Sequence, residues 1–412
     1  MSDYTNFEAE VWLGEIQDQV VARTVRSSVG TNELVSDKTV HSPYVDNAVA
    51  DTTTDGSFTA GSNDTTDESF TVSTQIISSE RIKSGDAMAS HYGLNSITAR
   101  NHSNAIARRE DQMMFSALAS TLTNSVTDGD LASATNSGGT NAIILSSANA
   151  EETVDLALQK AYESLMPQDE DVVAVLDFKT ARFMKEFLTG TGNNVADQSL
   201  NSGFGYFGQT ANGISVYTSQ LLEQEVVLSM ATQPTADDTV VVNGVTFTFK
   251  ASPSAAGEVD LGADVDATRA NLAAAINGGS GAGSDYIEIS SANRKAYKLN
   301  FVSATNDDSA DTLTIKCYGS LTVSETLTDG TDAFGDTYKN VPVFKRGIAH
   351  NYRIASAGTD ILGGTYQVSN GLAFANKTVG GFTGVEQELT ELYGTKIWNN
   401  MAGFGSIMKI KA

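Results

Sequence analysis

Apolar residues recur at helical spacing in three stretches of the chain. A short stripe predicts an amphipathic helix over residues 7–25. A longer stripe, uninterrupted by Gly or Pro, predicts a helix from about residue 96 to residue 124. At about 1.5 Å per residue, this helix would exceed roughly 40 Å. Its stripe consists of Ile106, Met113, Ala117, Leu118 and Leu122. A third helix is predicted over 151–166, and Pro167 ends it.

Strand patterns follow the third helix. The run Val172–Leu176 is too short for a helix and is typical of a central strand, and a helical pattern follows it directly, up to residue 188. Residues 212–222 are predicted to form another strand. Two further stretches near the end of the chain, 371–381 and 395–412, are also predicted to be extended.

Residues 43–75 are rich in Thr, Ser, Asp and Gly. Taken alone, this composition is typical of disorder. Phe58, Phe70 and Val72, however, lie in stretches where apolar and polar residues alternate, on either side of the sequence AGSNDTTD. This pattern predicts a long, exposed two-stranded arm. Because such an arm cannot bury its own apolar residues, we expect it to lie on a neighbouring molecule.

The sequence TVVVNGVTFTFK, residues 239–250, predicts a complete β-hairpin, because Asn-Gly supplies the two turn residues that tolerate a positive φ. It opens a segment, 228–338, with a predicted helix at 264–277 and predicted strands near 286–290, 297–303 and 312–318. We expect this segment to be an inserted α+β domain with its own core. The predicted core residues are Val240, Val242, Phe247, Phe249, Leu272, Ile276, Ile287, Ile289, Phe301 and Ile315.

Composition excludes several classes of protein. The chain has 50 acidic and 26 basic residues and a formal net charge of -24, so its surface as a whole repels nucleic acid and anionic membranes. One cysteine, Cys317, excludes an intrachain disulfide and any Cys-rich metal site. No apolar run approaches the length of a membrane span, and the N-terminus has neither a basic start nor an apolar core of a secretory signal. We therefore expect a soluble protein made in a cytoplasm.

Motifs for catalysis or cofactor binding are weak. The sequence GFGYFG at 203–208 matches a dinucleotide fingerprint, but a polar segment precedes it and a predicted strand follows it, so a glycine-rich loop is favoured. The chain has no serine elbow, P-loop or interpretable carboxylate pair. The sequence therefore predicts a protein that is not an enzyme and has no cofactor.

Candidate metal ligands are also weak. The four histidines have no His-x3-His or Cys/His spacing, and we interpret them as surface or interface residues. The acidic runs at 264–266 and 306–311 lack the spacing of an EF-hand, and we interpret them as solvated turns. The histidines are His41, His91, His102 and His350.

Charged residues of both signs meet on the predicted long helix, where Arg108 and Arg109 precede Glu110 and Asp111. Two interpretations stay open: ion pairs with acids of another subunit, such as those of the arm, or a plain solvated helix face. The residues that we expect at contacts between subunits are Phe58, Phe70, Arg108, Arg109, Glu110 and Trp398.

The order of these parts resembles the major capsid proteins of tailed phages, which have the Hong Kong 97 fold. Residues 1–227 and 339–412 carry the resemblance, and the order of the motifs is its specific part. NAIARREDQMMFSAL (104–118) resembles the spine helix of that family, and VVAVLDFKTARFMKEFL (172–188) resembles its first axial strand and helix. Three further stretches resemble its later strands: GFGYFGQTANGISVYTSQLL, GLAFANKTVGG and KIWNNMAGFGSIMKI.

The resemblance implies an α+β, Hong Kong 97-like capsid fold with five parts. These are an N-terminal arm (1–42), an E-loop (43–80), a peripheral domain with the spine helix (81–170 and 366–412), an axial domain (171–227 and 339–365) and the inserted domain (228–338). It further implies a structural subunit that forms hexamers and pentamers of an icosahedral shell around double-stranded DNA, in a virion assembled in the host cytoplasm.

The same resemblance implies portal and scaffolding proteins as partners and leaves a decoration protein open. We expect no fused scaffolding segment, no sequence-specific DNA binding and no membrane partner. We also expect no covalent cross-linking through the arm, since residues 43–75 contain no lysine. The inserted domain is expected on the outside of the shell, because its surplus of acids would repel packaged DNA. The alternatives are an encapsulin-like compartment and another phage structural subunit, such as a tail tube or filament.

Overall fold

The computed structural model describes residues 24–45, 65–83, 94–132, 135, 142–168, 171–190, 206–209, 213–355, 367–369, 372–377 and 384–412. The chain divides into two compact units. The first comprises Met1–Thr123 and Lys345–Phe404, and the second comprises Asn124–Phe344 and Gly405–Ala412. Most of the helix predicted over 7–25, together with Phe58 and His91, lies outside the described residues.

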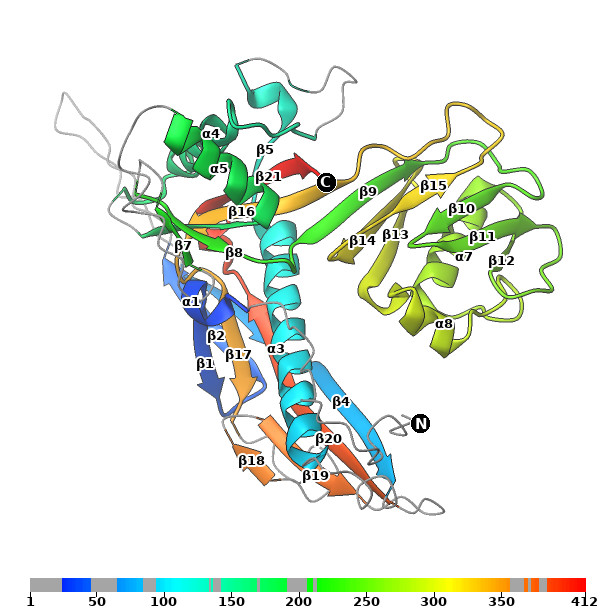
Figure 1. Cartoon of the computed structure of the whole chain (residues 1–412), viewed down its shortest axis with the longest axis horizontal. Helices are drawn as coiled ribbons and strands as arrows, with labels where there is room; N and C mark the ends of the chain where they lie inside the picture. The colour runs from blue at the N-terminus through cyan, green and yellow to red at the C-terminus, as the bar shows by residue number, and fades with distance from the viewer. Residues whose placement is uncertain are drawn as a thin grey trace, which may run out of the picture. The chain divides into compact units, whose positions relative to one another are not determined.

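The first unit is built on a long helix, α3 (Leu94–Thr121), which confirms the helix predicted from residue 96 to residue 124. The helix lies along two strands of a mixed sheet, β4 and β20 (Figure 1). Ile106 of α3 packs against Ile76 of β4 and Leu389 of β20, so the predicted apolar stripe faces the sheet. The elements of this sheet are, in order, β1 (Thr31–Val35), β17 (His350–Ile354), β20 (Gly384–Lys396), β19 (Leu372–Lys377) and β18 (Gln367–Ser369), with β4 (Thr74–Lys83) also paired to β20.

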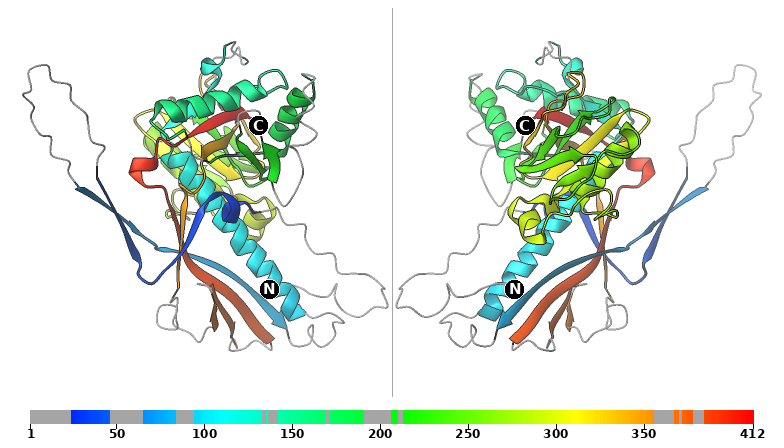
Figure 2. Two further views of the ribbon diagram at one scale, coloured as in Figure 1. Left: turned by 90° about the vertical axis from the view of Figure 1, so that its left-hand side faces the viewer. Right: turned by 90° about the vertical axis from the view of Figure 1, so that its right-hand side faces the viewer.

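Two strands of the first unit form a separate antiparallel ribbon. β2 (Thr39–Val45) pairs with β3 (Thr65–Thr71), from Thr39 opposite Thr71 to Val45 opposite Thr65. Figure 2 shows this ribbon running away from α3 and β20. The arm is two-stranded, as predicted, but its strands differ from the prediction: β2 begins four residues before Pro43, and β3 begins at Thr65, within the sequence AGSNDTTD that was expected to separate the strands.

The second unit contains a sheet whose described strands run in the order β13–β14–β9–β16–β6–β8–β7, with β21 (Gly405–Lys411) paired to β16 and β5 (Asn124–Val126) paired to β21. β6 (Val172–Leu176) is buried along its whole length, as predicted for a central strand. α4 (Ala150–Glu163) and α5 (Phe178–Gly190) confirm the two helices predicted on either side of it. The strand predicted over 212–222 is shorter, since β8 covers only Ser215–Thr218, and β7 (Tyr206–Gln209) pairs with it.

The inserted segment contains the predicted hairpin. β10 (Thr239–Val242) and β11 (Val245–Lys250) flank Asn243 and Gly244, whose φ values of 50° and 83° fit the turn expected for Asn-Gly. The hairpin lies in a sheet between β12 (Glu258–Asp260) and β15 (Val323–Glu325). Helix α7 (Val265–Asn277) buries Leu272 and Ile276 in the same core cluster as Phe247 and Phe249 of the hairpin. The Asp264 side chain accepts a hydrogen bond from the backbone N–H of Ala267 and so begins the helix.

One strand joins the inserted segment to the rest of the second unit. β9 (Glu223–Ser229) pairs along all seven of its residues with β14 (Thr312–Tyr318). At its other edge, β9 pairs with β16 (Tyr338–Lys345). Val226 and Leu228 of β9 belong to the same buried cluster as the hairpin residues. The predicted boundary at residue 228 therefore falls inside a strand, and the domain boundaries as a set stay a prediction.

Two predicted strands of the inserted segment are wrong. Residues 286–290 make only isolated bridges, at Tyr286, and residues 297–303 are mostly turn, with a 3-10 turn, η3 (Leu299–Phe301), before β13 (Val302–Asp307). A short helix, α8 (Ser291–Ala296), lies between them, begun by the Ser290 side chain, which accepts a hydrogen bond from the N–H of Asn293. Most of the predicted core residues are buried, but the Phe301 side chain is 39% exposed.

The end of the chain also differs from its prediction. The stretch 395–412 was expected to be extended throughout. Instead, a 3-10 turn (Asn399–Met401) interrupts it, and β21 begins only at Gly405. A Cβ atom at Gly405 would lie 2.7 Å from the Phe344 Cβ of β16, so only glycine lets the two strands approach at this point.

Candidate functional site

A buried ionic cluster lies beneath α3 in the first unit. Glu110 of α3 is fully buried, and its two carboxylate oxygens contact Arg26 at 2.8 Å and Arg353 at 2.5 Å. Arg353 of β17 also binds the fully buried Glu391 of β20 at 3.0 Å. Three distant parts of the sequence are therefore held together by two guanidinium groups. Such a cluster is costly to break from one side, because the remaining charge stays buried.

Asp111 ties the start of the described chain to the same helix. Its carboxylate accepts hydrogen bonds from the backbone N–H groups of Val25, at 2.9 Å, and Arg26, at 3.1 Å. Burial raises the pKa of Asp111 to about 6, although these hydrogen bonds act in the opposite direction. The short helix α1 (Arg26–Val29) is thereby fixed against α3.

Glu391 is the most perturbed acid of this cluster. Burial and the neighbouring charge of Glu110 raise its pKa to about 8, and Arg353 only partly offsets them. At neutral pH the Glu391 side chain is therefore mainly protonated. Glu110 and Asp111 then balance Arg26 and Arg353, and the buried cluster carries little net charge.

The structure separates the charged residues that the sequence grouped on the long helix. Glu110 and Asp111 face the interior of the first unit, whereas Arg108 is half-buried and Arg109 is exposed. The Arg109 side chain donates a hydrogen bond to Gln112, one turn away, at 3.3 Å. Glu110, predicted at a contact between subunits, has two partners within its own chain, Arg26 and Arg353, because α3 packs that face on the sheet. The role of the two arginines at such a contact stays a prediction.

The root of the arm is fixed to β20. Phe70 of β3 packs on a cluster of Val72, Tyr352, Ile354, Leu392 and Trp398. A Cβ atom at Gly394 of β20 would lie 2.7 Å from the Phe70 ring, so the ring requires a glycine beneath it. Glu68 of the arm accepts from Lys396 at 2.5 Å and from the N–H of Asn399 at 2.9 Å. Trp398 is thus a core residue of its own chain, only 3% exposed, and an additional role between subunits stays a prediction.

Beyond this root, the arm offers open strand edges. In the part of the chain that the structure describes, β2 and β3 pair only with each other, so each strand leaves one edge of backbone N–H and C=O groups without a strand partner. Such edges are ready to pair with another chain. The arm therefore leaves the first unit in a fixed direction and presents hydrogen-bonding groups that its own unit does not use for a sheet.

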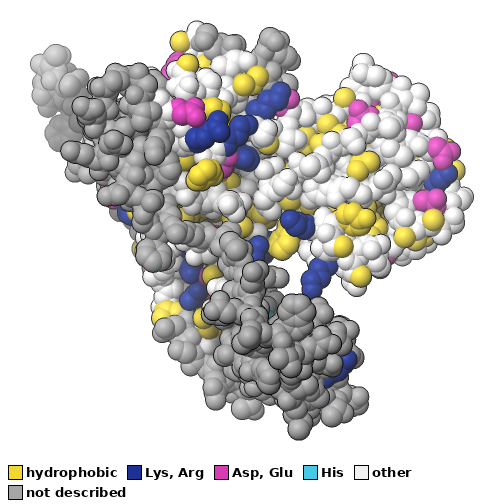
Figure 3. Space-filling view, in the orientation of Figure 1, with side chains coloured by type: hydrophobic (Ala, Val, Ile, Leu, Met, Phe, Trp, Pro, Cys, Tyr) yellow, Lys and Arg dark blue, Asp and Glu magenta, His cyan; other side chains and the backbone are white. Residues whose placement is uncertain are grey.

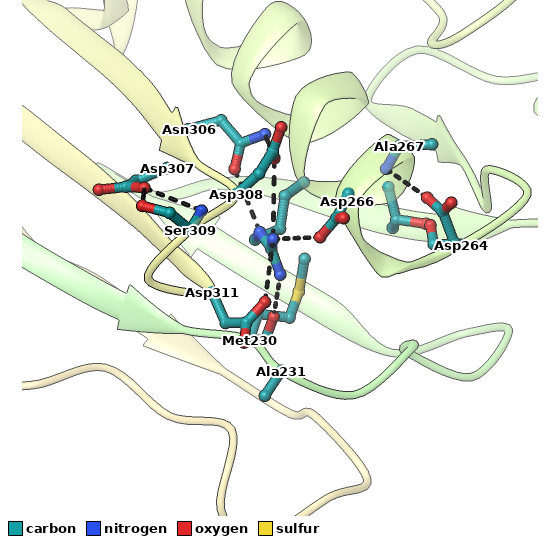
Figure 4. A network of polar contacts seen from close by, with 12 residues as sticks. Met230, Ala231, Asp264, Asp266, Ala267, Asn306, Asp307, Asp308, Ser309 and Asp311 are labelled. Carbon is teal, nitrogen blue, oxygen red and sulfur yellow. Dashed lines mark hydrogen bonds and ion pairs between the residues drawn. The ribbon is translucent and has the colours of Figure 1, made fainter.

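The two acidic runs of the inserted segment converge on a buried arginine. Arg269 of α7 is fully buried, and its guanidinium forms ion pairs with Asp266, with Asp311 at 3.3 Å and, more distantly, with Asp308 at 3.7 Å. These labelled acids surround one point in Figure 4. Arg269 also donates to the Met230 carbonyl at the end of β9, at 2.5 Å.

The three aspartates remain half or more exposed, between 50% and 65%, and together hold a buried cation. Asp308 and Asp311 lie in a solvated turn, as predicted, whereas Asp266 lies within a helix, in the first turn of α7. The sequence offered one signal for Arg269: it follows Asp266 by three residues, which places both on one side of a helix. Within the described residues, no group of His, Cys, Asp or Glu has an arrangement that could hold a metal ion.

The described histidines have separate partners. His41 contacts Asp67 of the arm at 2.9 Å, and His350 contacts Glu33 at 2.9 Å. His102 is buried against Ser78 at 2.8 Å, and burial lowers its pKa. None of these three contacts brings two histidines together. The histidines were predicted to be surface or interface residues. His41 lies at the surface, whereas His102 is buried within its own chain.

Two hollows adjoin the start of α5 in the second unit. The larger has a volume of about 790 Å³ and lies where the inserted segment meets the rest of this unit, with Phe178, Gln224 and Leu321 in its wall. Both hollows contain Asp177 and Lys339, which form an ion pair at 2.8 Å. Figure 3 shows Lys and Arg side chains gathered over the region of α5 and the C-terminus. Asp177 also accepts from the Thr180 N–H and so caps α5.

No family model matches the chain, and no curated protein is significantly similar to it. A solved structure from Mycobacterium phage Che8 is similar to the chain, with 11% identity and a TM-score of 0.50, over 98% of each chain. The capsid structure of the cyanophage P-SCSP1u is also similar, with 11% identity and a TM-score of 0.49, over 98% of this chain and 92% of that one. At 11% identity, the likeness to the Che8 structure shows a shared fold, which is mixed α+β in this chain.

A search of the helices in the described part of the chain finds none with the length and apolar character needed to cross a membrane.

Glu391→Gln should flatten the pH dependence of the first unit's stability. The folded state raises the pKa of Glu391 from 4.5 to about 8. The folded state therefore binds the proton more tightly, and stability is lost progressively as the pH rises from about 4.5 to about 8. Gln cannot ionise, so the variant should exceed the wild type at pH 8 to 9 by on the order of 1–3 kcal/mol. The measurement is urea unfolding from pH 5 to 9, followed by the fluorescence of the buried Trp398.

Asp37→Asn, at an exposed site of the same unit, is the matched control and should follow the wild-type pH profile. Below pH 6 the free energy of unfolding of Glu391→Gln should still change with pH, because Asp111 titrates there. If Glu391→Gln keeps the full wild-type slope up to pH 9, Glu391 is not the group responsible.

Arg269→Met should loosen the inserted segment. Methionine keeps much of the apolar stem but loses the hydrogen bonds to Met230 and Asn306, which should cost about 2 kcal/mol or more. Cys317 is the only cysteine of the chain and is buried, so thiol labelling reports opening of this segment. We expect labelling to become roughly 30-fold faster. Lys250→Met, which removes an exposed ion pair with Asp237, should change it little, and equal rates in both variants would contradict this role of Arg269.

Proposed function

We propose that the chain is the major capsid subunit of a tailed phage and assembles into the icosahedral shell that encloses its double-stranded DNA. The observation that carries the proposal is the arm. Its root is anchored on β20 by Phe70 and Glu68, while the ribbon beyond the root leaves two strand edges open. A monomeric protein would leave these edges as a liability, whereas a subunit can use them to pair with its neighbours.

The likeness to the Mycobacterium phage Che8 structure supports the proposal, since it extends over 98% of each chain. Within the capsid fold, we assign the ribbon to the E-loop (43–80) and α3 to the spine of the peripheral domain. β6 and α5 then belong to the axial domain, and 228–338 is the inserted domain. The spine assignment is consistent with the 28 residues of α3, one of the longest elements of the described chain.

The surplus of acids fits a container for DNA. A net charge of -24 disfavours adhesion of packaged DNA to the wall, so the proposal includes no sequence-specific DNA contact. Portal and scaffolding proteins are the partners that such a shell requires, and assembly in the host cytoplasm is part of the proposal. An encapsulin-like compartment is not favoured, because the full-length similarity is to a phage structure.

The inserted domain is proposed to lie on the outer surface, where its additional residues take no genome volume. Two roles are open for it: to reinforce the shell through neighbouring copies, or to meet the host or the environment. In Figure 3, the visible face of this segment is mostly uncharged, with scattered groups of hydrophobic side chains. A visible face of this kind is compatible with either role.

Electron microscopy of the purified protein tests the proposed function directly. We expect closed shells built from hexamers and pentamers. Tubes would favour a tail or filament subunit, and a protein that stays monomeric under all assembly conditions would contradict the proposal.

Assembly should protect the arm from proteases. Residues 43–75 have too little apolar content to offset their ordering entropy alone, so a neighbour must supply the ordering contacts. This stretch contains six acids and no Lys or Arg. A protease specific for acidic residues should therefore cut unassembled subunits there and spare shells, while trypsin, which has no site in 43–75, serves as the control. Equal cleavage by the acid-specific protease in both states would contradict the proposal.

A further inference from the structure

The far end of the inserted segment exposes aromatic and basic side chains together. Tyr297 is 45% exposed and Phe301 is 39% exposed. Lys295 and Lys298 are exposed beside them, at the junction of α8 and η3. These four residues are called the basic tip below. Exposed aromatic residues flanked by cations are typical of a surface that contacts another protein.

Charge pairing distinguishes the basic tip from the rest of the segment. From residue 237 to residue 336 the chain has 15 acids and six bases. Four of the bases have partners: Arg269 and Arg294 are buried, Lys250 pairs with Asp237, and Lys316 pairs with Glu223 and Glu225. Among the described residues, no ion pair involves Lys295 or Lys298. The two unpaired cations of an acidic segment therefore lie beside its exposed aromatic residues.

The basic tip is held rigidly. The Arg294 guanidinium donates to the carbonyls of Ala275, at 3.2 Å, and Ile276, at 2.6 Å, and so binds α8 to the last turn of α7. The Tyr297 ring lies over the hairpin turn, since a Cβ atom at Gly244 would be 3.5 Å from it. Little backbone entropy would therefore be lost when a partner covers the tip.

The same segment carries a complementary surface at its opposite end. The acidic end consists of Asp264, Asp266, Asp307, Asp308 and Asp311, and the one buried cation at its centre, Arg269, leaves four negative charges uncompensated. β13 runs from Val302, next to the basic tip, to Asp307 at the acidic end. α7 spans the same two ends, from Asp264 to Asn277. Six residues of strand separate the two surfaces by roughly 20 Å.

We propose that the basic tip of one subunit docks on the acidic end of the inserted segment of a second copy of this chain. This inference rests on the proposed function, because a shell brings many copies side by side. Lysines would approach Asp308 and its neighbours, while Tyr297 and Phe301 supply the apolar centre of the contact. Opposite ends of one domain meet in a heterologous contact, which closes into a ring when the rotation between copies allows it. The inserted segments would then form a continuous ring on each hexamer or pentamer.

Cysteine pairing tests this contact in assembled shells. The double variant Lys295→Cys and Asp308→Cys adds one thiol at each surface, and the native Cys317 is buried and does not compete. Within one chain the two sites are too far apart for a disulfide, which needs Cα atoms closer than about 7 Å. Mild oxidation of shells, after electron microscopy has shown that they are closed, should give a ladder of covalent multimers on a non-reducing gel.

Each single variant should give no ladder, which controls for random collision between shells. Closed shells of the double variant that remain monomeric on the gel would overturn this inference while leaving the proposed function intact. Failure of the wild-type protein to form shells would instead count against the proposed function itself.

Charge reversal supplies a second readout. Lys295→Glu with Lys298→Glu should still give folded subunits, shown by protection of Cys317 from labelling. Their shells should dissociate at a clearly lower denaturant concentration than wild-type shells. High salt should lower the denaturant concentration at which wild-type shells dissociate toward that of the variant shells, because salt screens the ionic rim of the contact. Lys250→Glu is the matched control, since its ion-pair partner, Asp237, lies in its own chain. Equal shell stability of the two reversals would contradict the docking.

Discussion

The first unit depends on the contacts of two arginines beneath α3 with buried carboxyl groups. Arg353 binds Glu110 and Glu391, and Arg26 binds Glu110 from the opposite side. These residues come from the beginning, the middle and the end of the chain. Because the Glu110 carboxylate is removed from water, loss of either arginine would leave its charge less compensated, so the attraction stabilises the unit only while both arginines are present. The direction of the arm follows from this arrangement, since its root packs on the same strand, β20, that carries Glu391.

The second unit is organised differently, around a shared strand. β9 gives one edge to β16 and the other to β14, so a single seven-residue strand belongs to the large sheet and to the core of the inserted segment. Arg269 reinforces the connection from the other end of β9 through the Met230 carbonyl. An insertion with this architecture has a fixed orientation within its unit, because continuous strand pairing and not a flexible linker connects it to the large sheet.

Regular elements could be predicted from the sequence because their signals are local. The uninterrupted stripe of α3, the apolar run of β6 and the Asn-Gly turn of the hairpin each follow from a few neighbouring residues. The failures have a different cause. Residues 286–290 and 297–303 were predicted to be strands, but a helix, α8, begins between them at a cap on Ser290 and is held by the long-range bonds of Arg294. Likewise, only tertiary packing decides that Glu110 faces inward while Arg109, its neighbour, faces solvent.

The shared strand also determines how mechanical load would pass through the second unit. Hydrogen bonds of an antiparallel ladder stand perpendicular to the strands. A pull along the axis of β9 therefore stretches the ladder to β14 in shear, with all seven residue pairs resisting together, whereas a pull across it would open the pairs one after another. Internal pressure in a closed container acts as tension within its wall. The pairing of β9 with β14 would therefore resist tension along the strand axis much better than tension across it.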